Sequence, residues 1–296
     1  MIVLREVTKT FEQLKAVCAV DLHINQGSIY GILGSNGAGK TTILKMIAGI
    51  YRQDLGDISV DGERIFENIS TKQDIFFVPD SPFFFGQYSV KWTADFYKSI
   101  YTNWSDERFA QLKNIFKIDL NKKVHSLSKG LQRQVALWCA LSTQPKVLLL
   151  DEPMDGFDPV IRHQFRNALI EEVANRQMTI VISSHNLDEI EDLCDTITIL
   201  HQGKKITERE LDDFKSDIHK VQMAFSHEIP KNLLEGFQVL KKELRGNVLI
   251  CVIKGAKEEI IQKIKVHEPV LLDILPLTLE EIFVYEMGDL GYGNEN

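Results

Sequence analysis

Apolar residues near the start of the chain recur first with the period of strands and then with that of a helix. Alternation of apolar and polar positions predicts strands over residues 2–7, 17–24 and 29–33. A glycine-rich loop follows the third strand, and the apolar spacing from Lys40 predicts a helix that ends near Gly49. A strand, a glycine-rich turn and a helix in this order are typical of the opening of a nucleotide-binding α/β unit.

The middle of the chain carries a helical pattern and then buried strands. Residues 89–145 have the helical period, with aromatic-rich turns, and predict a helical insert. Two continuous apolar runs, 147–150 and 179–183, flank an amphipathic helix predicted over 159–175. Such runs are expected of parallel strands that are buried on both faces of a sheet. The pattern therefore predicts an α/β core.

The character of the sequence changes after about residue 216. Strands are predicted over 221–225, 248–253 and 270–274, interleaved with helical stretches near 256–264 and 279–287. This pattern predicts a small α+β domain. The predicted organisation is an α/β domain over residues 1–215, a helical subdomain within it over about 89–145, and a C-terminal α+β domain over 216–296.

Composition excludes several classes of protein. The chain has 296 residues, is 44% hydrophobic and carries a net charge of −8, which is unlike the composition of disordered chains. This acidic balance argues against binding nucleic acid mainly through phosphates, so no nucleic-acid partner is expected. Because no apolar run reaches the roughly 18 residues of a spanning helix, and the N-terminus lacks a secretory signal, a cytoplasmic location is predicted.

Residues 34–41 fit the pattern G-x-x-x-x-G-K-[ST] at every fixed position. Glycines let successive backbone N–H groups point at phosphate oxygens, and the helix that begins near Lys40 adds the positive end of its dipole. Lys40 would reach the β- and γ-phosphates, and Thr41 would offer a hydroxyl to Mg²⁺. A glycine-rich turn with an incidental lysine is the alternative, which the flanking strand and helix disfavour. The nucleotide-binding candidates here are Gly34, Ser35, Asn36, Gly37, Ala38, Gly39, Lys40, Thr41 and Thr42.

Two later strands end in residues that could act on a phosphate. Asp151 and Glu152 follow the strand over 147–150, and ligands bind at the carboxyl ends of parallel strands. Asp151 would hold Mg²⁺, and Glu152 would orient or deprotonate the water that attacks the γ-phosphate. His185 follows the strand over 179–184 and would contact the γ-phosphate from the same sheet edge. Acidic residues in an ordinary turn and a histidine without a catalytic role are the alternatives.

These residues, in this order, resemble the nucleotide-binding subunit of an ATP-binding cassette (ABC) transporter. The phosphate loop is shared by many ATPases, but residues 127–131 look like the family's signature LSGGQ and 151–153 like its Walker B motif. Residues 155–159 look like the D-loop, and His185 looks like the switch histidine. The resemblance covers about residues 1–215 and implies an α/β P-loop ATPase fold with a helical insert, which binds ATP and Mg²⁺.

The resemblance also implies how further residues act. Phe11 is placed like the aromatic residue that stacks on adenine, although a plain core aromatic is the alternative. Two cassettes would pack head to tail, with each ATP between the phosphate loop of one and the signature of the other. Ser128, Gly130 and the D-loop residue Asp158 would then contribute to ATP binding across the dimer.

Three positions depart from the family pattern. Asp80 stands where glutamine is usual, and we expect it to serve as a direct or indirect Mg²⁺ ligand. Leu131 replaces the signature glutamine, which removes a polar partner across the dimer. Phe157 replaces a D-loop leucine, a tolerable exchange at an apolar site.

The function implied is an ATPase that dimerises on ATP and drives export of a drug, peptide or lipid-like substrate. Its permease would be a separate membrane chain that holds it at the inner face of the cell membrane, and the second cassette would be a copy or a paralogue. The aromatic run over 83–88 would either dock on that permease or be buried in the chain's own helical insert. A soluble ABC ATPase acting on ribosomes or nucleic acid is the alternative function, and an ATP sensor without turnover is disfavoured by Glu152 and His185.

Overall fold

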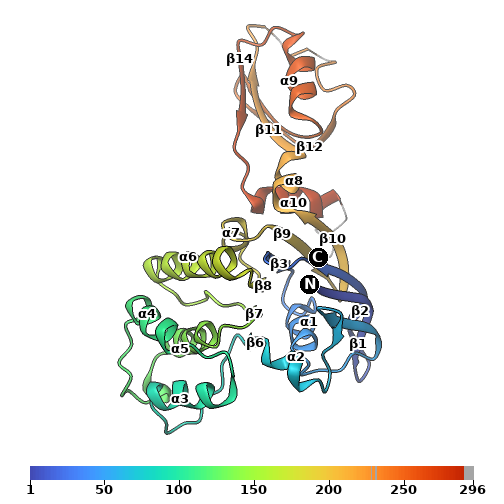
Figure 1. Ribbon diagram of the computed structural model, residues 1–296. Helices are drawn as coiled ribbons and strands as arrows, with labels where there is room; N and C mark the ends of the chain where they lie inside the picture. Colours follow the sequence, from blue (N-terminus) through green and yellow to red (C-terminus); the bar gives the residue numbers. More distant parts are fainter. Residues whose placement is uncertain (228, 231, 290–296) are drawn as a thin grey trace. The chain divides into compact units, whose positions relative to one another are not determined.

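The computed structural model describes residues 1–227, 229–230 and 232–289 (Figure 1). The chain divides into two compact units, Met1–Glu208 and Arg209–Asn296. The boundary predicted between residues 215 and 216 falls inside α8 (Leu211–Ser216), which follows directly on β10 (Lys204–Glu210). The last residues of the predicted C-terminal domain, 290–296, lie outside the described part of the chain.

The first unit is built on a mixed six-stranded sheet in the order β10-β9-β3-β8-β7-β6. Its inner strands pair in parallel, β3 with β8 and β9, and β7 with β6 and β8. The carboxyl ends of these parallel strands therefore meet at one edge of the sheet, which is where the sequence places the candidate catalytic residues. Besides β10, the strands of this sheet are β3 (Ile29–Leu33), β6 (Ile75–Val78), β7 (Val147–Asp151), β8 (Thr179–Ser184) and β9 (Thr196–His201).

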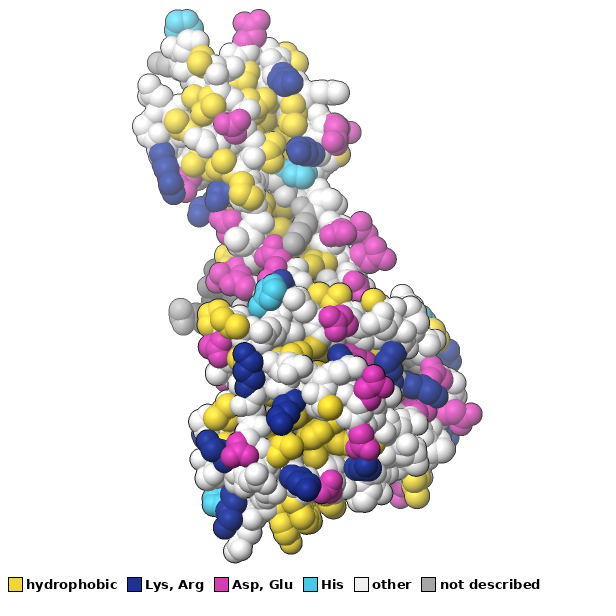
Figure 2. All heavy atoms as spheres, turned by 60° about the vertical axis from the view of Figure 1, so that its left-hand side comes forward, with side chains coloured by type: hydrophobic (Ala, Val, Ile, Leu, Met, Phe, Trp, Pro, Cys, Tyr) yellow, Lys and Arg dark blue, Asp and Glu magenta, His cyan; other side chains and the backbone are white. Residues whose placement is uncertain are grey.

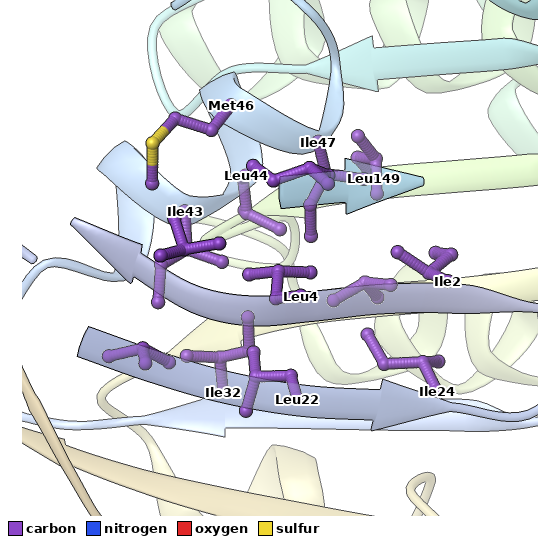
Figure 3. Packing of buried hydrophobic residues seen from close by; sticks show 14 of the residues in the cluster. Ile2, Leu4, Leu22, Ile24, Ile32, Ile43, Leu44, Met46, Ile47 and Leu149 are labelled. Atoms are coloured by element: carbon purple, nitrogen blue, oxygen red, sulfur yellow. The ribbon is translucent and has the colours of Figure 1, made fainter. Parts of the chain in front are cut away.

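A smaller antiparallel sheet in the order β2-β1-β4-β5 covers the other side of helix α1 (Lys40–Ile47). Its strands are β1 (Ile2–Phe11), β2 (Leu14–Ile24), β4 (Leu55–Val60) and β5 (Glu63–Arg64). Apolar side chains of α1 point toward β1 and β2 and toward Leu149 of β7 (Figure 3). Because α1 contributes to one core with both sheets, the loop that precedes it is held on a rigid base.

Three helices between β6 and β7 form the predicted helical subdomain: α3 (Val90–Ile100), α4 (Asp106–Phe116) and α5 (Lys129–Ser142). Each begins at a serine whose hydroxyl accepts a backbone N–H of the first turn. Helix α5 packs against α3, α4 and β6, so it joins this subdomain to the sheet. The other helical elements of the unit are α2 (Ile69–Gln73), η1 (Val124–Ser126), α6 (Pro159–Arg176) and α7 (Leu187–Glu191).

The second unit is an α+β domain. Its antiparallel sheet has the order β12-β13-β11-β14, and apolar residues of α9 pack with the sheet in one cluster. Strand β12 was not predicted, because its sequence QVLKKELR carries charged residues along an edge where no position is fully buried. The elements are β11 (Ile218–Ala224), β12 (Gln238–Arg245), β13 (Val248–Lys254), α9 (Lys257–Lys265), β14 (Leu271–Leu275) and α10 (Leu279–Asp289). None of the helices in the described ranges could span a bilayer.

Candidate functional site

A cavity of about 570 Å³ opens where the phosphate loop meets the ends of β6 and β7. The loop between β3 and α1 forms its floor, the hairpin of β1 and β2 forms one wall, and the residues after β6 and β7 form another. The cavity therefore gathers segments that are far apart in the sequence. Its lining consists of Phe11, Leu14, Ala16, Ser35, Asn36, Gly37, Ala38, Gly39, Lys40, Thr41, Thr42, Lys45, Pro79, Asp80, Ser81, Asp151 and Glu152.

Lys40 supplies a buried positive charge to this cavity. Its ammonium group is buried and donates to the carbonyl oxygens of Gly34 at 2.7 Å and Ser35 at 3.3 Å. It also lies 3.7 Å from the Glu152 carboxylate. A polyphosphate in the cavity would offer negatively charged oxygens to the same ammonium group and to the loop N–H groups.

Thr41 and Asp151 provide oxygen atoms that could bind a metal ion. The Thr41 hydroxyl donates to the Asp151 carboxylate, with oxygen–oxygen distances of 3.0 and 2.8 Å. Ser183 of β8 donates to the same carboxylate at 2.5 Å and holds it in place. Hard oxygen ligands of this kind suit Mg²⁺. Across the described ranges no group of three or more His, Cys, Asp or Glu side chains could hold a metal, so phosphate oxygens would have to complete the shell.

Glu152 and His185 come together at the edge of the sheet, as their positions after β7 and β8 predict. The Glu152 carboxylate accepts the backbone N–H of His185 at 3.3 Å and lies 2.8 Å from Nδ1 of the same residue. Glu152 has a left-handed backbone with φ of 48°, which costs a non-glycine residue about 1–3 kcal/mol. The backbone strain and the histidine contacts together orient this carboxylate beside Lys40.

Phe11 lies at the end of β1 and lines the cavity. Phe11 is 38% exposed and packs edge-on against Tyr51, with ring centroids 5.3 Å apart. The Nζ atom of Lys9 lies 5.4 Å from the centroid of the Phe11 ring. The ring is therefore a surface group of the cavity and not a buried core aromatic. An adenine base could stack on its exposed part.

We expect Phe11→Ala to raise the Kd for ATP by about tenfold, because stacking of a base on an aromatic ring contributes about 1–3 kcal/mol. Titration of the purified protein with ATP would measure this. Leu55→Ala is the control, because Leu55 is 67% exposed on β4 and does not line the cavity, and it should raise the Kd by less than about threefold. Equal effects of the two substitutions would contradict stacking on Phe11.

Asp80 follows β6 and also lines the cavity, but its carboxylate makes an ion pair with Arg133 of α5. Its expected role toward Mg²⁺ stays a prediction. Arg133 was not singled out by the sequence analysis. The signal that could have found it is a charged residue within the long buried run of α5, since a charge in such a place needs a partner.

Three residues expected to bind ATP across a dimer lie away from this cavity, and their role toward a second copy stays a prediction. Ser128 is exposed and caps α5 by accepting the N–H of Leu131 at 3.3 Å. Gly130 lies beside the backbone of Gly156, where an added Cβ would be 3.0 Å from the carbonyl oxygen. Asp158 caps α6 by accepting N–H groups of the first turn at 2.9 and 3.1 Å.

Phe157 and Leu131 are the two other residues that depart from the family pattern. Phe157 is buried and packs edge-on against Phe165 with ring centroids 6.0 Å apart, so it fills an apolar site as predicted. Leu131 is half-buried in the first turn of α5.

Comparisons with known proteins identify the family of this site. The "ABC transporter" family profile matches residues 17–155. The ABC transporter ATP-binding protein YtrB of Bacillus subtilis (strain 168) is 33% identical over 288 residues, which covers 97% of this chain and 98% of that protein. The chain belongs to the ATP-binding proteins of ABC transporters. It is therefore an ATPase that binds ATP, and hydrolysis in this family is coupled to transport.

A second relative and a solved structure are also similar to this chain. The Nod factor export ATP-binding protein I of Burkholderia lata is 31% identical over 302 residues, which covers 95% of this chain and 94% of that protein. Among solved structures, a dimeric ATP-binding cassette in a post-hydrolysis state bound to ADP and Pi superposes with a TM-score of 0.65. It is 23% identical and covers 71% of this chain and 99% of its own, so this likeness shows the ABC ATPase fold. The predicted α/β fold of the P-loop ATPase class is confirmed.

Proposed function

We propose that this protein is the ATP-hydrolysing subunit of an exporter, and that it docks on a separate membrane permease at the cytoplasmic face. The observation that carries this proposal is an exposed aromatic surface directly after β6, at the border between the nucleotide cavity and the helical subdomain. Similarity over nearly the whole chain to a protein named for Nod factor export supports export as the direction.

The aromatic surface consists of Phe83, Phe85, Tyr88, Trp92 and Phe96. Phe83 is 82% exposed and Phe85 is 51% exposed, so the run is not buried in the chain's own insert. Tyr88 stacks on Trp92 with ring centroids 3.6 Å apart, and Trp92 stacks on Phe96 at 5.5 Å. Figure 2 shows hydrophobic side chains gathered at the end of the first unit where Figure 1 places α3. Exposed apolar groups packed in this way suit an apolar segment of a partner protein.

We further propose how the cavity residues share the hydrolysis of ATP. Lys40 and the loop N–H groups would hold the phosphates. Thr41, Asp151 and Asp80 would be the oxygen ligands for Mg²⁺, which would neutralise charge that develops on the phosphates. Glu152 orients and deprotonates the attacking water. His185 holds the Glu152 carboxylate in position and faces the γ-phosphate. The strained backbone of Glu152 limits the directions its carboxylate can take.

A second cassette, a copy or a paralogue, completes the site in this proposal. It would present Ser128, Gly130 and Asp158 to the ATP of the first. The Ser128 hydroxyl and the first N–H groups of α5 are then available to phosphate oxygens, since they lie at an exposed helix N-terminus. A cassette of this fold is dimeric in a solved structure, which supports the arrangement.

The test is recovery of the partner from native cells. We expect a tagged Glu152→Gln form, held with ATP, to bring down a hydrophobic protein with several membrane spans from the membrane fraction. Adding Phe83→Ser and Phe85→Ser should reduce that recovery at least several-fold, because both exposed rings would be lost from the interface.

The matched control is Ile69→Ser on the same background, since Ile69 is 78% exposed but lies on α2 outside the aromatic surface. It should leave the recovery unchanged. Recovery of ribosomes or nucleic acid without a permease would instead support the alternative function and overturn this proposal.

A further inference from the structure

Arg133 joins three segments of the first unit. It lies on α5 and is only 9% exposed. Its guanidinium group donates to the backbone carbonyl oxygen of Asp80 through Nε at 3.1 Å and through Nη2 at 2.7 Å. It also pairs with the Asp80 carboxylate and donates to the backbone carbonyl oxygen of Asp155. The Asp155 carboxylate lies 3.6 Å from Nη1.

Each of these segments borders the catalytic machinery. Asp80 lines the cavity that also contains Lys40, Asp151 and Glu152. Asp155 lies in the short segment that leads from Glu152 to α6, and α5 begins at the Ser128 cap. Arg133 is the group that holds the loop after β6 and the segment after β7 to the same helix.

The charge of Arg133 matters because of where Asp80 lies. A buried guanidinium is stable only when its donors and its charge are matched, and here two carbonyl oxygens and the carboxylates of Asp80 and Asp155 match them. Conversely, Asp80 places a carboxylate beside a cavity that must accept the several negative charges of ATP. Without Arg133 that carboxylate would repel the phosphates.

We propose that Arg133 is a positioning residue for nucleotide binding, which neutralises Asp80 beside the ATP phosphates and fixes the loops that carry Asp80 and Asp155. The proposal concerns ATP binding and does not depend on export or on a permease. It makes a prediction that a purely structural role does not make, because removal of either partner changes the local charge in opposite directions. Arg133→Gln leaves the Asp80 carboxylate at the cavity without its cation, whereas Asp80→Asn removes that negative charge and leaves Arg133 with the exposed Asp155 carboxylate.

The test measures the Kd for ATP by calorimetry in EDTA at low ionic strength, so that no divalent cation masks the charges. We expect Arg133→Gln to raise the Kd about tenfold and Asp80→Asn to lower it about threefold, which correspond to one charge acting over several ångströms at intermediate dielectric. The double variant should bind ATP within about threefold of the parent protein. Arg133→Lys keeps the charge but not the forked bonds of the guanidinium group, so it should bind ATP more tightly than Arg133→Gln and less tightly than the parent.

Arg64→Gln is the matched control, since Arg64 pairs with Asp57 at 3.1 Å but both side chains are exposed. It should leave the Kd unchanged. Asp80→Asn retains the bonds from Arg133 to both carbonyl oxygens, so this variant tests the proposal even if Arg133→Gln fails to fold. Weaker or unchanged ATP binding by Asp80→Asn would overturn the proposal, as would an Arg133→Lys form that binds as weakly as Arg133→Gln.

Discussion

Replacing Glu152 by glutamine is expected to lower kcat for ATP hydrolysis by about 10²–10³-fold, because a positioned general base contributes about that much to the rate. Glutamine has nearly the same shape, so it can still accept the N–H of His185 that reaches this side chain at 3.3 Å. It cannot accept a proton from water. The Kd for ATP should therefore change by less than about threefold.

Steady-state ATPase assays and ATP titrations of the purified protein would separate the two effects. The matched control is Glu189→Gln. Glu189 is a buried carboxyl beyond the same sheet edge that accepts the Ser184 hydroxyl at 3.2 Å, and it does not line the cavity. Burial raises the pKa of Glu189, so glutamine removes a charge that this site already disfavours. If both substitutions lowered kcat equally, Glu152 would not be the base.

Much of this site could be predicted from the sequence because its residues follow local rules. The phosphate loop needs only the strand before it and the helix after it, both of which show clear apolar periods. Asp151 is the last residue of β7, and Glu152 and His185 stand directly after β7 and β8. The shared direction of these buried parallel strands brings their ends together. Their contacts, such as 2.8 Å between Nδ1 of His185 and Glu152, then follow from the topology of the sheet.

Contacts between segments distant in the sequence could not be predicted in this way. Arg133 and Asp80 are 53 positions apart, and no periodic pattern connects them. The resemblance to the ABC family implied a Mg²⁺ role for Asp80, because Asp80 stands where glutamine is usual. Which cation its carboxylate meets depends on how α5 packs against β6. The ion pair between Arg108 of α4 and Glu172 of α6, with 2.6 Å between Nε and Oε1, could not be predicted for the same reason.

The elements of the fold also divide into those that a local sequence pattern predicts and those that it does not. The helical insert that contains α3 to α5 and the buried strands β7 and β8 were predicted because burial of one face or both imposes a pattern. Edge strand β12 was not predicted because none of its positions is fully buried and its charged residues leave no clear alternation. The boundary between the two units was predicted between residues 215 and 216 from the change in sequence pattern. In the structure it lies between Glu208 and Arg209, and β10 continues directly into α8.

Gly39→Ala is expected to lower the free energy of unfolding of the first unit by about 3 kcal/mol, because two costs add at this position. Gly39 has φ of +105°, a conformation that alanine rarely adopts. An added Cβ would also lie 2.5 Å from the carbonyl oxygen of Ala16, a backbone atom of β2 that cannot rotate away. Relief of that contact would have to shift the phosphate loop away from β2.

Gly37→Ala separates the two costs within the same loop. Gly37 has φ of +82°, but an added Cβ would meet nothing within 4 Å, so only the backbone cost of about 1 kcal/mol should remain. Urea denaturation followed by tryptophan fluorescence reports on the first unit alone, because all three tryptophans, Trp92, Trp104 and Trp138, lie there. Equal destabilisation by both substitutions would show that the Ala16 contact relaxes at no cost. A larger loss for Gly39→Ala would mean that close packing of this glycine against β2, in addition to its backbone angle, fixes the loop that holds the phosphates.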